Sequence, residues 1–187
     1  GLELTGVVVN KGYSVETFGI GEIVGVSKAV DTCRNCDMCD KKKYLNCKKG
    51  ATTIYNDRNN YNHSNEKGFP TFGGLSQMIV VDMNYVIKIL CYGSISLDRI
   101  TPLLYSGSLV YSAMKNVALS KDSTVGIIGL TNFGNIACKL ANALGSNVTV
   151  FDTNNKKNLS LHDLKVDEFI NINDNEELIK KINTFDF

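Results

Sequence analysis

The stretch CRNCDMCDKKKYLNC occupies residues 33–47 and places Cys33, Cys36, Cys39 and Cys47 at the spacing C-x2-C-x2-C-x7-C. Structural Zn²⁺ takes four tetrahedral ligands, with sulfur about 2.3 Å from the ion. Three close cysteines can wrap one ion, and the fourth can close the site from the next turn. We therefore predict one structural zinc per chain, with no open position for a substrate. Buried free thiols or a disulfide pair are the alternative.

The composition is that of an ordinary soluble protein of 187 residues, 43% of them hydrophobic, with a net charge of +1. This charge gives no reason to expect nucleic acid or an anionic membrane as a partner. No apolar run approaches the roughly 20 residues that cross a bilayer, and no signal peptide is visible. Crowded thiols without a signal peptide indicate a reducing, cytoplasmic location, with Cys91 and Cys138 standing apart. We interpret both ends of the chain as cut from a longer protein.

Basic residues flank the cysteines and are expected to offset the negative charge of four thiolates around one Zn²⁺. They are Arg34, Lys41, Lys42, Lys43, Lys48 and Lys49.

The first half of the chain reads as β structure around this cysteine lobe, which we place at residues 31–50. Apolar runs predict strands over 4–9, 21–26, 76–81 and 85–89. The segment 51–71 is polar and rich in Asn, and it predicts a surface loop. We place a domain boundary near residue 92, so that residues 1–92 form one domain and 93–187 the next.

The second half alternates strands and helices. Helical stretches are expected from Ser96 and over 108–118, and strands over 124–128, 148–151 and 169–172. Apolar residues from Phe133 to Leu144 lie at helical spacing, and Gly145 is well placed to end that helix. Asp174 with Glu177 is typical of a helix start. Short links between strands and helices favour a parallel, doubly wound α/β sheet, and the closing residues 185–187 read as the start of a further strand.

The segment Gly129-Leu130-Thr131-Asn132-Phe133-Gly134 follows a strand and opens a helix, as a dinucleotide-binding fingerprint does. The first Gly makes the turn, and the last allows helix and strand to pack closely. Thr131 stands where the middle Gly normally lets the backbone approach the pyrophosphate, and its hydroxyl could donate to a phosphate oxygen. A plain strand-to-helix turn without a cofactor is the alternative.

Asp152 ends the next strand, where a carboxylate can accept hydrogen bonds from ribose hydroxyls. Its charge would repel the 2′-phosphate of NADP and favours NAD, whereas Lys156 and Lys157 just after it would attract that phosphate. The other interpretation is that Asp152 only caps a turn.

Taken in order, these features resemble the zinc-containing medium-chain alcohol dehydrogenases, and within them the cinnamyl alcohol dehydrogenase group. Four stretches carry the likeness: Gly1-Leu2-Glu3 with Gly6 and Gly12, the lobe from Cys33 to Cys47, Phe72 to Asp82, and Leu103 to Ser112. The resemblance implies a GroES-like, β-rich catalytic domain portion followed by a partial Rossmann domain. It also implies NAD(P)-dependent hydride transfer between alcohol and aldehyde, and a homodimer when the protein is full length.

The catalytic zinc of that family uses the His of a Gly-His-Glu motif and a Cys near residue 105, and these positions hold Leu2 and Tyr105. Leucine cannot ligate a metal, and a protonated tyrosine is a poor ligand. Glu3 remains, but one carboxylate does not hold Zn²⁺. Neither His63 nor His162 matches a ligand position, and both read as exposed loop residues.

Two hypotheses follow from the replacement of these catalytic-zinc ligands. The first is an oxidoreductase shifted toward reduction of conjugated double bonds, in which hydride adds to carbon and Tyr105 donates the proton. The substrate would then be a conjugated enal instead of a simple alcohol or aldehyde. The second is a catalytically inactive, zinc-stabilised remnant or binding module.

Overall fold

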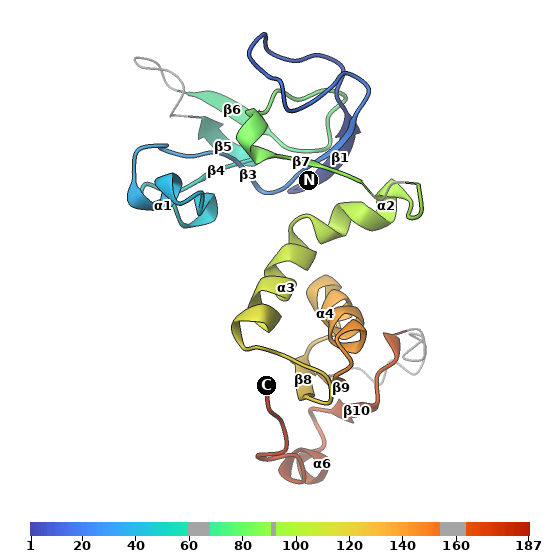
Figure 1. Ribbon diagram of the computed structural model, residues 1–187. Helices are drawn as coiled ribbons and strands as arrows, with labels where there is room; N and C mark the ends of the chain where they lie inside the picture. Colours follow the sequence, from blue (N-terminus) through green and yellow to red (C-terminus); the bar gives the residue numbers. More distant parts are fainter. Residues whose placement is uncertain (60–67, 91–92, 154–163) are drawn as a thin grey trace. The chain divides into compact units, whose positions relative to one another are not determined.

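The computed structural model describes residues 1–59, 68–90, 93–153 and 164–187, and Figure 1 draws the others in grey. Contacts within the chain divide it into two compact units, Gly1–Tyr105 and Ser106–Phe187. The domain boundary near residue 92 stays a prediction. Within the described residues, no helix has the length and apolar character needed to cross a membrane.

The first unit is built on an antiparallel sheet of three strands in the order β1-β2-β7. Strand β1 spans Leu4–Val7, β2 spans Ile23–Val26 and β7 spans Val86–Lys88, so three of the predicted strands are confirmed within shorter bounds. Val26 lies opposite Leu4 on one side and Val86 on the other. A small apolar core of Val26, Val30 and Ile54 packs against these strands.

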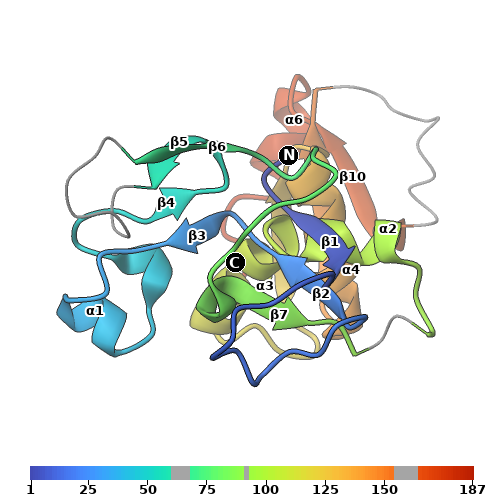
Figure 2. The ribbon, with the colours of Figure 1, turned by 90° about the horizontal axis from the view of Figure 1, so that it is seen from above.

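Shorter elements complete the first unit. Two antiparallel pairs join β3 (Ala29–Asp31) to β4 (Thr52–Thr53), and β5 (Tyr55–Asn59) to β6 (Phe69–Phe72). The cysteine lobe carries α1 (Asp37–Asp40) and the 3₁₀ turn η1 (Tyr44–Asn46), and it lies beside β3 and β4 (Figure 2). The remaining elements are η2 (Met83–Tyr85), α2 (Leu97–Ile100) and η3 (Thr101–Leu103).

Two sequence-based assignments in this unit are wrong. The described parts of 51–71 are not loop alone, because they contain β4, β5 and β6, and Thr52 and Ile54 are buried. Residues 76–81, predicted as a strand, are irregular and pair with no described strand. Leu75, Met78 and Val80 are largely exposed there, because β-forming side chains alone do not supply a partner edge.

The second unit has the predicted alternation of strands and helices. It runs from α3 (Ser106–Asn116) through β8 (Thr124–Ile128), α4 (Asn132–Ala143), β9 (Asn147–Asp152) and β10 (Glu168–Asn171) to α6 (Asn175–Ile179). The three strands are parallel, in the order β10-β9-β8. The α/β fold class is therefore confirmed.

The core of this unit lies between the sheet and the packed pair α3 and α4. Val148 and Val150 are fully buried on β9, and they face Cys138 and Ala141 of α4, which are also fully buried. The helix ends where expected, since Gly145 follows it with φ +85° in the left-handed region. Asp174 caps α6 by accepting from the backbone N–H groups of Glu176 and Glu177, as the sequence indicates.

The closing residues lie along the outer edge of β8. The Asp186 N–H donates to Thr124 O at 3.0 Å, and the Gly126 N–H donates to Phe187 O at 2.8 Å. These bonds tie the closing residues to β8, but residues 185–187 form no regular strand, so the predicted further strand is not formed within the described residues.

Candidate functional site

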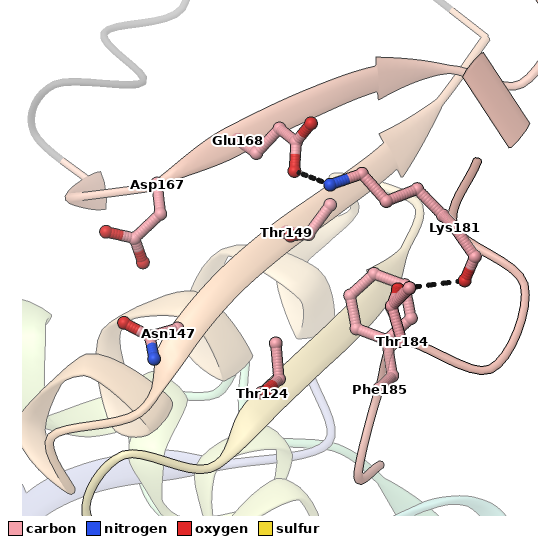
Figure 3. Close-up of a pocket in the computed structure, with 8 residues that line it drawn as sticks. All are labelled: Thr124, Asn147, Thr149, Asp167, Glu168, Lys181, Thr184 and Phe185. Atoms are coloured by element: carbon pink, nitrogen blue, oxygen red, sulfur yellow. Dashed lines mark hydrogen bonds and ion pairs between the residues drawn. The ribbon is translucent and has the colours of Figure 1, made fainter.

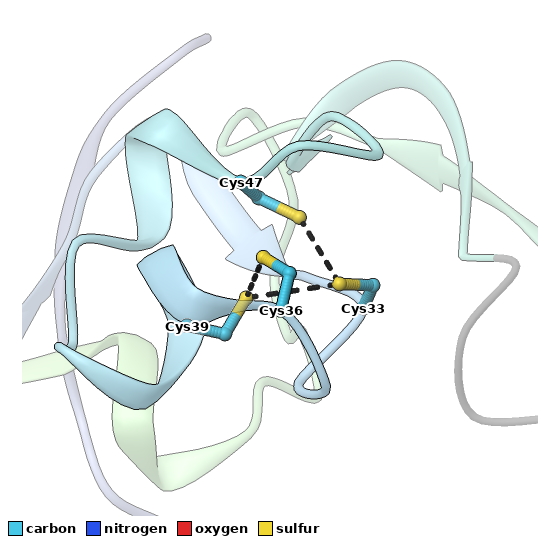
Figure 4. A group of neighbouring side chains, drawn as sticks. All are labelled: Cys33, Cys36, Cys39 and Cys47. Carbon is cyan, nitrogen blue, oxygen red and sulfur yellow. Dashed lines mark hydrogen bonds between the residues drawn. The ribbon is translucent and has the colours of Figure 1, made fainter.

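The four cysteines of the lobe converge on one point (Figure 4). Their Sγ atoms all lie within 4.8 Å of one another, with separations of 3.4 Å for Cys33–Cys47, 3.5 Å for Cys36–Cys39 and 3.9 Å for Cys33–Cys39. A tetrahedron with Zn–S bonds of about 2.3 Å has edges of about 3.8 Å. Cys39 and Cys47 are buried, and the cluster is the one group among the described residues whose geometry could hold a metal ion.

The thiols do not ionise alike. Backbone hydrogen bonds with Lys48 and Cys39 lower the pKa of Cys36 to about 6. A backbone hydrogen bond with Asn35 acts to lower the pKa of Cys33, but burial and the surrounding thiols outweigh it and raise that pKa to about 11. A backbone hydrogen bond with Cys33 also lowers the pKa of Cys47, so Cys36 and Cys47 favour the thiolate form whereas Cys33 opposes it. A bound cation would neutralise the negative charge of the cluster.

A buried polar network joins the lobe to the rest of the first unit. The fully buried Asp31 accepts from Arg34 at 2.8 Å, and the same guanidinium reaches Asp82 at 3.1 Å. Thr32 is also fully buried, and its Oγ1 lies 2.6 Å from the hydroxyl oxygen of Tyr85. The Cys39 thiol donates to the same Thr32 Oγ1 at 3.4 Å. The backbone leading into the first cysteine is thus held by charge and hydrogen bonds.

The role expected of the flanking basic residues needs correction for Arg34. Arg34 faces the carboxylates of Asp31 and Asp82, since they lie within hydrogen-bonding distance of its guanidinium. Lys48 pairs with Asp37 at 2.8 Å on the surface of the lobe. Asp37, and to a smaller extent Cys36, raise the pKa of Lys48, so this lysine also interacts with the cluster. Lys41, Lys42, Lys43 and Lys49 are exposed.

The turn between β8 and α4 meets the backbone demands of the dinucleotide fingerprint. Gly129 has φ +86°, and a Cβ on Gly134 would lie 2.0 Å from Gly129 O, so only glycine fits there. Thr131 caps α4, and its Oγ1 accepts from the Gly134 N–H at 3.4 Å. The Asn135 side chain, which the sequence did not single out, donates to Thr131 O at 2.9 Å.

Asp152 lies against this turn from the end of β9. Its Oδ2 accepts from the Leu130 N–H at 2.7 Å. The carboxylate thus holds the peptide that follows Gly129, and the structure brings Asp152 together with the predicted turn. Its other oxygen, Oδ1, lies 3.3 Å from the Thr153 hydroxyl.

A second group of predicted residues meets in the first unit. The Glu3 carboxylate accepts from the Tyr105 N–H at 2.7 Å, and the Tyr105 hydroxyl lies 3.4 Å from Nζ of Lys28. Lys28 was not predicted as a site residue. A lysine inside the largely apolar run from Ile23 to Val30 is the sequence signal that could have found it, because lysine seldom lies among buried residues unless it is paired.

Some predicted residues lie outside the described part of the chain. They are His63, Cys91, Lys156, Lys157 and His162.

A cavity of about 590 Å³ opens in the second unit at the amino ends of the strands (Figure 3). Thr124, Asn147 and Glu168 line it, and Glu168 forms an ion pair with Lys181. Ligands of parallel α/β sheets bind at the opposite, carboxyl ends, where Gly129 and Asp152 lie. We therefore do not assign the cofactor to this cavity.

Comparison with known proteins places these features in one family. Residues 1–90 match the alcohol dehydrogenase GroES-like domain. The chain is 35% identical over 180 residues to mannitol dehydrogenase of Petroselinum crispum, covering 95% of this chain and 51% of that protein. The chain belongs to the zinc-type, medium-chain alcohol dehydrogenase family.

Solved structures agree with this assignment. Cinnamyl alcohol dehydrogenase from Sorghum bicolor superposes with a TM-score of 0.88 at 32% identity, covering 97% of this chain and 50% of that one. The CAD protein of Helicobacter pylori, solved with NADP(H), gives a TM-score of 0.80 at 32% identity, covering 88% and 46%. The chain spans about half the length of the curated relatives it matches.

Replacing Gly134 with Ala should destabilise the second unit by about 3 kcal/mol, because the new methyl group would overlap Gly129 O and the backbone would have to move. Gly126→Ala is the matched comparison. Its Cβ would lie 3.2 Å from a ring carbon of Phe151, which can shift, so we expect a loss below about 1 kcal/mol. Urea denaturation measures the free energy of unfolding of both variants. Equal losses would show that the turn at Gly134 has as much room for a side chain as the strand at Gly126.

Replacing Arg34 with Met should destabilise the lobe by about 2 kcal/mol, because Asp31 is fully buried and would lose its cationic partner. This value is smaller than the one expected for a fully buried ion pair, because the Arg34 side chain is 42% exposed to solvent. Lys48→Met is the control. It removes the exposed pair with Asp37, so the denaturation midpoint should not change measurably. A similar midpoint for both variants would show that the network does not hold the lobe.

Proposed function

We propose that the protein containing this chain is an NAD(P)-dependent oxidoreductase of the alcohol dehydrogenase family, with a structural zinc in the lobe. The observation that carries the proposal is the convergence of four thiols, in a chain whose second unit folds into a nucleotide-type turn. Substrates would be small alcohols, aldehydes or conjugated enals. We also propose a cytoplasmic protein that forms a homodimer when full length.

The structural zinc would be held by Cys33, Cys36, Cys39 and Cys47. Their separations suit a tetrahedral zinc, and an all-thiolate set is the donor chemistry of closed, structural sites. Four protein ligands leave no position for a substrate. The ion would therefore stabilise the lobe and take no part in chemistry.

The cofactor would lie on the turn formed by Gly129, Leu130, Thr131 and Gly134, beside Asp152. Lys157, which the sequence also predicts to bind it, lies outside the described residues. The positive φ of Gly129 and the absence of room for a side chain on Gly134 are the features that such a turn requires. The N-terminus of α4 would face the pyrophosphate. When bound, the nicotinamide supplies or accepts the hydride.

The usual catalytic zinc does not fit this chain. Leu2 and Tyr105 stand at two of its ligand positions, and the Glu3 carboxylate already accepts from the Tyr105 backbone. Catalytic zinc needs three protein ligands and one open position. We therefore propose that simple alcohols are poor substrates, and that the remaining activity is reduction of an activated double bond with Tyr105 as the acid.

The same substitutions favour a second candidate, a zinc-stabilised remnant or binding module without catalysis. In that case the lobe and the turn would keep their folds without turnover. Activity measurements separate the two candidates.

The zinc assignment predicts close to one zinc per chain in the purified protein. Cys36→Ser should lose the metal and destabilise the lobe, because three thiolates no longer close the site. Cys138→Ala is the control, since this buried cysteine lies in α4, in the second unit, and should leave the zinc content unchanged. Elemental analysis gives the count. Retention of zinc in Cys36→Ser would refute the assignment.

The charge of Asp152 predicts that NAD binds more tightly than NADP. Asp152→Asn removes the charge and keeps an oxygen that can accept from the Leu130 N–H, so it should shift the ratio of dissociation constants toward NADP by about tenfold. Asp152→Ser should shift it similarly and also weaken both cofactors, because the turn loses its acceptor. Calorimetric titration measures the constants. Tighter binding of NADP by the unsubstituted protein would contradict the prediction.

The proposed function is tested by assaying the protein with cinnamyl-type alcohols and with conjugated enals, alongside metal counting. We expect one zinc, reduction of the enal double bond and poor alcohol oxidation, with a loss of activity in Tyr105→Phe of roughly 10²-fold or more. Robust alcohol oxidation with two zincs per chain would contradict the proposal. Absence of any turnover with cofactor bound would favour the binding module.

A further inference from the structure

Lys28 occupies an unusual position for a lysine. It lies between β2 and β3, in a run whose neighbours are mostly buried, and it is itself half-buried. Its Nζ is 3.4 Å from the Tyr105 hydroxyl and 5.3 Å from the centre of the Tyr105 ring. No salt bridge to Lys28 is found within the described residues. Its charge is therefore directed at the tyrosine and not at a carboxylate.

Tyr105 is held in place from two sides. The Glu3 carboxylate accepts from its backbone N–H at 2.7 Å, and the Ser27 hydroxyl donates to the preceding carbonyl, that of Leu104, at 2.9 Å. Ser27 is the neighbour of Lys28 in the chain, so one segment positions both the ammonium and the backbone beside the phenol. Such fixed geometry is what a preorganised binding group requires.

The chemistry of the pair suits an oxygen that carries negative charge. An ammonium can only donate, so the phenol oxygen accepts from Lys28 and the phenol proton is directed toward another acceptor. The positive charge of Lys28 also opposes a dication at Tyr105, where the catalytic zinc of the family would be ligated. The charge and the hydrogen-bond donors at this position therefore suit an anion or a polarised carbonyl better than a metal ion.

We infer that Lys28 and Tyr105 form an oxyanion-binding pair that receives the carbonyl oxygen of a conjugated aldehyde, with Lys28 as a second catalytic residue. The inference deepens the proposed function and rests on it. Bound NAD(P)H would supply the hydride for a new C–H bond at the β-carbon, and the π electrons of the double bond would move toward the carbonyl, giving an enolate. Tyr105 transfers its proton to the enolate oxygen, Lys28 stabilises the phenolate, and water returns the proton to Tyr105. The enol then tautomerises to the saturated aldehyde.

The test compares Lys28→Met, Lys28→Arg and Tyr105→Phe with Lys88→Met as the matched control. Lys88 lies over an aromatic ring as Lys28 does, 5.7 Å from the centre of the Phe18 ring, and it pairs with Glu22, but no tyrosine hydroxyl is involved. Two quantities are measured: calorimetric binding of cinnamate, a carboxylate probe that needs no turnover, and kcat and KM for reduction of cinnamaldehyde. Thermal melting confirms that each variant is folded.

We expect Lys28→Met to weaken cinnamate binding at least tenfold and to lower kcat by roughly 10²-fold, as loss of an oxyanion donor does. Lys28→Arg should recover most of the cinnamate binding and most of kcat, because the positive charge and the hydrogen-bond donors return. If Lys28 had only a structural role, its replacement would not change kcat separately from KM. Lys88→Met should match the unsubstituted protein in binding and rate.

A folded Lys28→Met variant that binds cinnamate and turns over normally would overturn the inference, as would a failure of the unsubstituted protein to bind cinnamate. Binding of cinnamate that depends on Lys28, without any reduction of enals, would support the pair and refute the proposed reaction. Reduction of enals at a rate that does not depend on Lys28 would support the proposed reaction and refute the pair.

Discussion

The first unit depends on the convergence of four cysteine thiols, and the structural zinc that we propose would relieve the repulsion between their thiolates. Their sulfur atoms converge within 4.8 Å, yet the surrounding lobe has one short helix, α1, and little apolar core, since Leu45 is 59% exposed. Cys36 ionises readily, whereas the pKa of Cys33 is raised to about 11. The proposed zinc would therefore provide the free energy that a hydrophobic core provides elsewhere. The Asp31–Arg34–Asp82 network then fixes the direction in which the lobe leaves the sheet.

The second unit is stabilised differently, by ordinary packing around a turn that admits no side chain. Val148, Val150, Cys138 and Ala141 form a fully buried centre, and the strand can reach the helix over Gly134 only because no Cβ is present there. Asp152 adds a hydrogen bond that joins the end of β9 to the turn. The geometry that would cradle a cofactor is thus also the geometry that closes the core.

Features with local causes could be predicted from the sequence. The spacing of the cysteines, the helix cap at Asp174 and the glycine that ends α4 depend on neighbouring residues, and all three take the predicted form. Features that depend on distant partners could not be predicted. The apolar run 76–81 finds no described strand to pair with, the polar segment 51–71 contributes strands because Thr52 and Ile54 are buried, and Lys28 meets Tyr105 across 77 residues. The family resemblance thus identified Tyr105, but only the fold identified its partner.

The central claim is that the metal chemistry of this family is reduced here to one structural ion, with an ammonium and a phenol where the second ion would be bound. X-ray absorption spectroscopy of zinc in the purified protein tests this most directly. The account predicts a single environment of four sulfur atoms at about 2.3 Å, with no nitrogen or oxygen neighbours. A spectrum that requires nitrogen or oxygen ligands at about 2.0–2.1 Å would reveal a second zinc site and contradict the account.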